Sequence, residues 1–424
     1  MNIEKNKEIF MDYNKYLREK MVPAFGCTEP IALAFAASRA RFILGEDPER
    51  ITARLSGNII KNVNSVKVPG TDGRKGIEIS LAAGAFLGDY TKKLEVLSDV
   101  DKSKLGYLDD LIKKGLCDIE LLHEKKGLYI DVSMEKGEKT SRVVIKDFHT
   151  NIIFKSLNDE ILFEKKEEEL EEEDKIDLSF DKIYDFAKNG NYDDIIDVLD
   201  KEIEYNYAIA KEGIENPWGA NIGKMVLEEA GDKYSEKLVA YAAAGSDARM
   251  SGCEKPVVIN SGSGNQGITV SVPIIIYAKD HDIEKDKLYR ALIFANLIGL
   301  YIKEGIGELS AYCGVVSAGC ASVCGLAFMK DEDRNIIKAT LTNALATNSG
   351  LICDGAKESC AIKIASSLKM GFLAYKQAKE GNSFKAGDGI VKGDIDEMIK
   401  TVGHIAMEGM RETDEVILRE MIGK

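Results

Sequence analysis

The first clear hydrophobic pattern in the chain predicts a helix. Residues Ile31 to Leu44 are mostly apolar or helix-favouring, Thr28 is a suitable N-cap, and Gly45 follows as a stop. After Gly45 the pattern changes to alternation between apolar and polar positions, as in Ile51 to Leu55. Such alternation is typical of a strand with one buried face.

The next hundred residues combine strand patterns with one short helix. Ile77 to Leu87 favours a helix, and Ile119 to Met134 reads as a hairpin turning at Glu124 to Gly127. A second hairpin is expected from Arg142 to Asp147 and Asn151 to Leu157. Residues of about 46–163 are therefore expected to form an α+β lobe with an antiparallel sheet.

A strongly acidic run, Glu164 to Lys175, follows this lobe and is read as a solvated linker. From Ile176 onward the pattern is helical, and several segments are rich in Ala, Gly, Ser and Cys, which lets buried helices approach closely. The expected fold class is α+β, a mainly helical core with an inserted lobe. The expected division is 1–45 packing on the C-terminal core, 46–175 as the lobe with its linker, and 176–424 as the helical domain.

Composition narrows the class of protein. The 424 residues contain 57 Lys and Arg against 71 Asp and Glu, a net charge of −14, which argues against nucleic-acid and anionic-membrane partners. The charged N-terminus has no signal core, and no apolar run reaches the ~20 residues of a membrane span. The expected location is therefore the cytoplasm, with reduced thiols.

The eight cysteines suit a site better than a disulfide scaffold. Cys353 and Cys360 flank a glycine-containing turn before a helix expected to begin near Ala356, where the helix N-terminus and Lys357 would stabilise thiolates. Cys313 lies near another expected helix start. Three such thiolates suit an iron–sulfur cluster, although their spacing is not that of ferredoxins. Cys320 and Cys324 are read as small core residues.

A further thiol, Cys27, lies beside Thr28 and Glu29 at a helix start. A thiol in that place is expected to have a lowered pKa and to act as a base or nucleophile, or else the segment is a plain cap. The four histidines do not lie near cysteines at zinc-ligand spacing, and His123 and His149 are read as sheet residues.

Polar loops supply candidate substrate-binding groups, each as consistent with a turn as with a site. The loop from Asn260 to Gly267 precedes a helix and suits a carboxylate or phosphate. The candidate substrate-binding residues are Thr28, Asn58, Lys61, Asn62, Gly70, Thr71, Ser261, Ser263, Asn265, Gln266 and Lys357.

These motifs occur together and in the same order in one family. Gly26 to Pro30, Lys61-Asn62 with Pro69 to Thr71, Asn260 to Gly267, Ala311 to Gly314 and Ile352 to Lys357 resemble the L-cysteine desulfidases, which are related to the α part of iron–sulfur L-serine dehydratases. The resemblance runs from about Tyr13 to Met421.

The resemblance implies an enzyme that uses a [4Fe-4S] cluster to convert L-cysteine to pyruvate, ammonia and hydrogen sulfide. It places Cys313, Cys353 and Cys360 as cluster ligands. Cys27 lies in the family's most recognisable motif and is expected to be either the third ligand in place of Cys360 or a catalytic group. The expected base is Cys27 or Glu29. By analogy, the protein is expected to be a homodimer.

Two other functions fit the same residues. One is the same cluster chemistry on L-serine or another β-substituted amino acid, which a substrate panel would distinguish. The other is a non-catalytic iron–sulfur or thiol redox sensor, which would bind a partner in a redox-dependent manner and show no turnover. A pyridoxal phosphate lyase is disfavoured because Lys357 and Lys363 lack a convincing frame for that cofactor.

Overall fold

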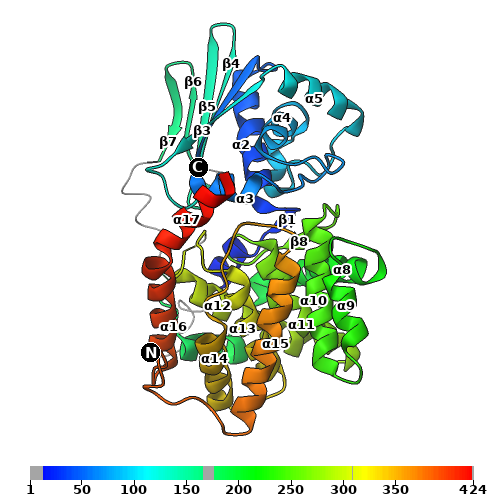
Figure 1. The fold of residues 1–424 in the computed structure, drawn as a ribbon, viewed down its shortest axis with the longest axis vertical. Coiled ribbons are helices and arrows are strands. Elements are labelled where there is room, and N and C mark those ends of the chain that lie inside the picture. Colours follow the sequence, from blue (N-terminus) through cyan, green and yellow to red (C-terminus); the bar gives the residue numbers. More distant parts are fainter. Residues whose placement is uncertain (1–12, 166–175, 308, 423–424) are drawn as a thin grey trace.

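The computed structural model describes residues 13–165, 176–307 and 309–422, and it consists of a sheet lobe beside a larger helical part (Figure 1). Most of the expected acidic linker lies outside the described residues. The strands are β1 (Pro23–Phe25), β2 (Arg50–Ser56), β3 (Cys117–Leu122), β4 (Tyr129–Lys136), β5 (Lys139–Lys146), β6 (Ile152–Leu157), β7 (Glu160–Glu164) and β8 (Pro256–Val258).

The helices of the lobe pack against its sheet, and other helices form the larger part of the molecule (Figure 1). Those of the lobe are α2 (Thr28–Leu44), α3 (Gly57–Val63), α4 (Ile77–Leu87) and α5 (Leu105–Lys113), with short 3-10 turns η1 (Tyr90–Glu95) and η2 (Lys102–Lys104). Those of the helical part are α7 (Phe180–Asn189), η3 (Asp193–Ile195), α8 (Ile196–Glu215), α9 (Ile222–Glu229), α10 (Tyr234–Met250), α11 (Gly264–Asp280), α12 (Lys285–Glu304), α13 (Gly314–Met329), α14 (Arg334–Asn348), α15 (Cys360–Lys379), α16 (Ile395–His404), η4 (Ile405–Gly409) and α17 (Arg411–Ile422).

The lobe sheet has the strand order β3-β2-β4-β5-β6-β7. The predicted hairpin of β5 and β6 is confirmed, but the predicted hairpin over Ile119 to Met134 is wrong, because β2 lies between β3 and β4. β2 pairs parallel with β3, and the intervening helices make the crossover that a parallel pair requires. The α+β class is confirmed, and the sheet is mixed rather than wholly antiparallel.

Helix α2 belongs to the lobe. Its small and apolar residues pack against α4, β4 and β5, and Gly84 of α4 lies so close that a Cβ there would be 2.2 Å from the Ala34 carbonyl oxygen. The predicted packing of residues 1–45 on the C-terminal core is therefore wrong for α2. It holds for the residues before β1, where the Tyr13 ring contacts the Phe186 ring and Arg18 binds Asp197. The wider division into 1–45, 46–175 and 176–424 stays a prediction.

The helical part is built around buried helices with small side chains. α13 contacts α11, α12, α14 and α15, and its residues Cys320 and Cys324 have no exposed surface. These two thiols fill space between helices, as the sequence indicated. No helix in the described ranges is long and apolar enough to cross a membrane.

Two of the contacts between the lobe and the helical part bear on the position of the site. β1 pairs antiparallel with β8, which lies between α10 and α11. The C-terminal helix α17 runs back toward the lobe and contacts α3 (Figure 1). Because the pair is antiparallel, the segment that follows β1 lies beside the residues that precede β8, at the junction of the two parts.

Candidate active site

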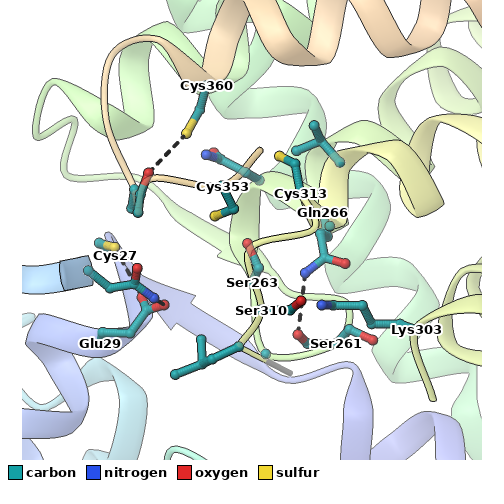
Figure 2. A pocket seen from close by; sticks show the side chains of 18 of the residues that line it. Cys27, Glu29, Ser261, Ser263, Gln266, Lys303, Ser310, Cys313, Cys353 and Cys360 are labelled. Carbon is teal, nitrogen blue, oxygen red and sulfur yellow. Dashed lines mark hydrogen bonds between the residues drawn. The ribbon is translucent and has the colours of Figure 1, made fainter. Parts of the chain in front are cut away.

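One pocket at this junction is lined by four of the eight cysteines, namely Cys27, Cys313, Cys353 and Cys360. Figure 2 shows Cys27 and Glu29 on one side and Cys313 and Cys353 toward the other. The remaining lining residues are Asn62, His149, Arg249, Ser261, Gly262, Ser263, Asn265, Gln266, Lys303, Leu309, Ser310, Tyr312, Gly314, Val315, Gly355 and Ala356.

A short β-bridge brings Cys313 and Cys353 together. Tyr312 pairs with Ile352, the Cys313 amide donates to the Leu351 carbonyl at 2.9 Å, and the Cys353 amide donates to the Ala311 carbonyl at 2.6 Å. Cys313 is also the N-cap residue of α13, in extended conformation, as expected for a thiol at a helix start. Two cysteines 40 positions apart in the sequence therefore share one wall of the pocket.

Cys360 is the first residue of α15, so the prediction that this helix begins near Ala356 is wrong. The preceding residues form a turn, in which the Lys357 amide donates to the Cys360 sulfur at 3.4 Å. Gly355 has a φ of 92°, and a Cβ there would lie 2.7 Å from the Lys61 carbonyl oxygen. This turn requires glycine, because an L side chain would meet the backbone of α3.

The three thiols on this side differ in their ionisation. The pKa of Cys353 falls to about 6, because the Cys313 thiol hydrogen-bonds to it and outweighs the effect of burial, with a further contribution from the Lys61 ammonium. The same hydrogen bond, together with burial, raises the pKa of Cys313. Burial also raises the pKa of Cys360. The pair Cys313 and Cys353 thus shares one proton in the absence of a bound metal.

The expected lowered pKa of Cys27 is wrong. Burial raises the pKa of this thiol, and the Glu29 carboxylate adds to the effect, while the Arg249 guanidinium opposes it. The Cys27 thiol donates to Glu29 Oε2 at 3.3 Å, and the Thr28 hydroxyl donates to the same oxygen at 3.0 Å. Asn62 Nδ2 donates to Glu29 Oε1 at 2.9 Å. Glu29 is therefore a buried acceptor poised to take a proton from Cys27.

The loop predicted to bind an anion does lie in the pocket, where Ser261, Ser263, Asn265 and Gln266 all line it. It leads directly into α11, so Asn265 and Gln266 lie in the first turn of that helix. The first residue of the loop, Asn260, donates to Asn296 Oδ1 at 2.8 Å. The loop is thereby fixed to the interior of the helical part.

This anchor continues to a buried carboxyl group. Asn296 Nδ2 donates to the two carboxyl oxygens of Glu202 at 3.0 and 3.1 Å. Burial raises the pKa of Glu202 to about 8. Glu202 is therefore neutral at pH 7, and no charge has to be desolvated at this position.

Other predicted substrate-binding residues lie outside the pocket. Lys61 and Asn58 are in the short helix α3 rather than in a loop, and both bind the carboxylate of Asp414 from α17. Lys357 donates to the carbonyl of Asp354. Gly70 and Thr71 form the predicted turn, whose Pro69 packs so closely on Gly26 that a Cβ at Gly26 would be 1.9 Å from it. That turn supports the Cys27 segment from behind.

Sequence reasoning missed several charged or titratable residues of the pocket, among them His149, Arg249 and Lys303. His149, expected in the sheet, lies in the turn between β5 and β6, is 5 % exposed, and has an unpartnered Nε2. Burial lowers its pKa, so the imidazole is neutral. Arg249, near the end of α10, is 3 % exposed. Neither His149 nor Arg249 stands in a recognisable motif, and only the fold brings them to the cysteines.

The thiols fit a cluster better than a single ion. Among the described residues, no three His, Cys, Asp or Glu side chains converge closely enough to hold one metal ion. A [4Fe-4S] cluster instead takes one thiolate on each of several irons. Cys313, Cys353 and Cys360 all face one pocket, and Cys353 is easily deprotonated. This donor set suits such a cluster.

The helical side of the pocket falls within a match to a known family. Residues 91–419 match the family of serine dehydratase alpha chains. The chain belongs to that family. The match includes the loop predicted to bind an anion (residues 260–267, here called the anion loop) and all three candidate cluster cysteines. Cys27, Glu29 and Lys61 precede it.

Relatives of similar length are similar in sequence to this chain along nearly all of its length. A UPF0597 protein of Desulfitobacterium hafniense is 43% identical over 427 residues, covering 100% of this chain and 99% of the relative. A UPF0597 protein of Lachnoclostridium phytofermentans is 45% identical over 408 residues, covering 96% and 98%. These relationships support an iron–sulfur, serine dehydratase-like lyase. They do not distinguish L-cysteine, the substrate expected from the sequence, from L-serine.

Proposed function

We propose that this protein catalyses the β-elimination of L-cysteine to pyruvate, ammonia and hydrogen sulfide, with a [4Fe-4S] cluster held by Cys313, Cys353 and Cys360. The observation that carries the proposal is the pocket itself. It combines three thiols on the helical side with a hydrogen-bonded thiol–carboxylate pair, Cys27 and Glu29, on the lobe side. Elimination from an amino acid requires both a proton acceptor and an electrophile.

The bound cluster would supply an open iron that acts as a Lewis acid. The chain itself provides the proton path. Cys27 holds its proton at neutral pH and donates it to Glu29, so that the sulfur can take the α-proton as its own proton passes to the carboxylate. Asn62 and Thr28 orient that carboxylate.

The overall reaction is balanced without a redox partner. The bond from the α-carbon to its proton and the bond from the β-carbon to sulfur both break, and the sulfide leaves with that proton as hydrogen sulfide. The resulting aminoacrylate takes up water to give pyruvate and ammonia. Burial of the acid–base pair keeps bulk water from competing for the proton.

The second candidate substrate is L-serine, and family membership favours it directly, since the family is that of serine dehydratase alpha chains. The reaction is the same except that water leaves in place of hydrogen sulfide. The two substrates differ only in the leaving atom.

The test is anaerobic purification followed by iron and sulfide analysis, an absorption spectrum and a substrate panel. The expected result is bound iron and pyruvate formation, faster from L-cysteine than from L-serine. Faster turnover of L-serine would replace the proposed substrate. An iron-free protein with full turnover would contradict the cluster, and redox-dependent partner binding without turnover would favour the sensor function. The expected homodimer stays a prediction, which sedimentation would test.

A further inference from the structure

Arg249 is a buried cation in the pocket without a carboxylate partner. Its Nη2 donates to the Gly26 carbonyl at 2.8 Å, and its Nη1 donates to Asn265 Oδ1 at 3.2 Å. Its Nε has no hydrogen-bond partner. No ion pair to Arg249 occurs within the described ranges of the chain. Both acceptors are neutral, so the charge of the guanidinium is not compensated by the protein there.

Such an arrangement is energetically unfavourable unless an anion completes it. Burial of a charge is costly, and an arginine has five donor hydrogens, of which the two contacts above use two. Glu29 lies in the same pocket, but its hydrogen bonds come from Cys27, Thr28 and Asn62. Arg249 lines the same pocket as Cys27 and Cys360, so its positive charge lies at the surface of that pocket.

The lysines that the sequence suggested for a substrate carboxylate are engaged elsewhere. Lys61 is 2 % exposed, pairs with Asp414 and donates to the Cys353 carbonyl at 3.3 Å. Lys357 donates to a backbone carbonyl and does not line the pocket. Lys303 does line it, but on the side of Ser261 and Ser310, away from Cys27 (Figure 2).

We propose that Arg249 binds the α-carboxylate of the substrate, with the Asn265 amide and the start of α11 completing the site. The guanidinium matches a carboxylate by its fork of parallel donors. In this place it also stabilises the negative charge that develops toward the carboxylate as the α-proton leaves for Cys27. The identity of the anion as an amino-acid carboxylate rests on the proposed function, whereas the anion site rests on the burial of Arg249.

The test compares two unreactive ligands that differ only in the carboxylate, L-alanine and L-alaninamide, by anaerobic calorimetry on cluster-loaded protein. The wild type is expected to prefer L-alanine roughly 10- to 100-fold, the range of charge-assisted hydrogen bonds. In Arg249→Gln the preference should fall to within about threefold, and in Arg249→Lys it should be intermediate, because an ammonium keeps the charge but not the fork. Arg290→Gln, which removes an arginine of the helical part that does not line the pocket, is the matched control and should keep the wild-type preference.

The outcomes separate the two proposals. A merely structural role for Arg249, through its bond to the Gly26 carbonyl, would weaken both ligands alike and leave their ratio unchanged, which would overturn the inference. A wild type without any preference for L-alanine would overturn it too. Arg249→Lys decides the matter if Arg249→Gln does not fold. The wild type could also prefer L-alanine, and Arg249→Gln lose that preference, while the wild type turns over neither L-cysteine nor L-serine. That outcome would retain the anion site and reject the proposed function.

Discussion

The two faces of the pocket are built from different kinds of side chain. The lobe face contributes Cys27 just before α2, Glu29 in the first turn of α2 and His149 in the turn between β5 and β6. In the proposed function, Cys27 and Glu29 hold and transfer the proton. The helical face contributes three thiols and the anion loop, held by helix ends and a β-bridge. The difference indicates that a thiol's position, rather than its identity, decides its chemistry here.

Two thiols illustrate this contrast. Cys27 has a raised pKa and donates to a carboxylate, so it is suited to proton transfer. Cys353 has a pKa lowered to about 6 and lies near the Lys61 ammonium, so it is suited to bind iron as a thiolate. Both lie in one pocket, yet their variants should fail in different ways.

Cys353→Ser should give the largest effect. The hydroxyl is a poor iron ligand at neutral pH, so we expect loss of most bound iron and of all measurable turnover. Iron analysis and pyruvate formation check this under anaerobic conditions. Cys320→Ser is the matched control within the helical part and should keep its iron, and equal iron loss in both variants would contradict the assignment.

Cys27→Ala should leave the iron content intact and lower kcat by roughly 10²- to 10⁴-fold, the usual contribution of a general acid–base group. The absorption spectrum and steady-state kinetics of the same preparation measure both. Loss of the cluster in this variant would instead make Cys27 a ligand, and the contrast between the two faces would disappear.

Glu202→Gln tests the support beneath the anion loop. Glu202 has a pKa of about 8 in the folded protein against an ordinary value of 4.5, so the native state binds its proton more tightly than the unfolded state does. The contribution of Glu202 to stability is fully present below about pH 4.5 and is lost as the pH rises toward about 8. The variant should therefore gain stability relative to wild type over this interval, by roughly 4 kcal/mol at its upper end. Urea unfolding at pH 5 and pH 8 measures the difference, and a constant difference would contradict the neutral carboxyl.

Asp414→Asn should have the smallest effect. Lys61 would lose its charged partner at the contact of α17 with α3, and we expect a loss of about 2 kcal/mol in the free energy of unfolding. The preference for L-alanine over L-alaninamide should stay at the wild-type value, since Lys61 lies outside the pocket. Thermal unfolding measures the stability, and calorimetry measures the ligand preference. A changed preference would indicate that Lys61 contributes to substrate binding.

The sequence allowed prediction of those features that depend on local pattern. The helices beginning at Thr28 and Ile77, the β5–β6 hairpin and the pocket loop after Asn260 follow from periodicity, caps and glycine positions. The relation to serine dehydratase alpha chains is confirmed by the match over residues 91–419, whereas the L-cysteine desulfidase specificity stays a prediction.

What the sequence did not reveal depends on long-range pairing. β2 separates two strands that are adjacent in the sequence, and only that sheet order makes the first predicted hairpin wrong. Arg249 and His149 enter the pocket through tertiary packing, without a motif of their own. Local reasoning also assigned Cys27 a lowered pKa from its helix start, where burial and Glu29 in fact outweigh the helix end.

The small β1–β8 ribbon has a consequence for how the active protein is made. It pairs Pro23 with Val258, so the strand that precedes Cys27 can pair only after a further 235 residues have been synthesised. Contacts of such sequence separation form late, because loop closure has to precede them. During synthesis the N-terminal lobe can therefore fold before the pocket exists, and the thiol set is complete only once Cys360 has left the ribosome. Under the proposed function, iron and sulfide would enter only a chain that already extends past Cys360.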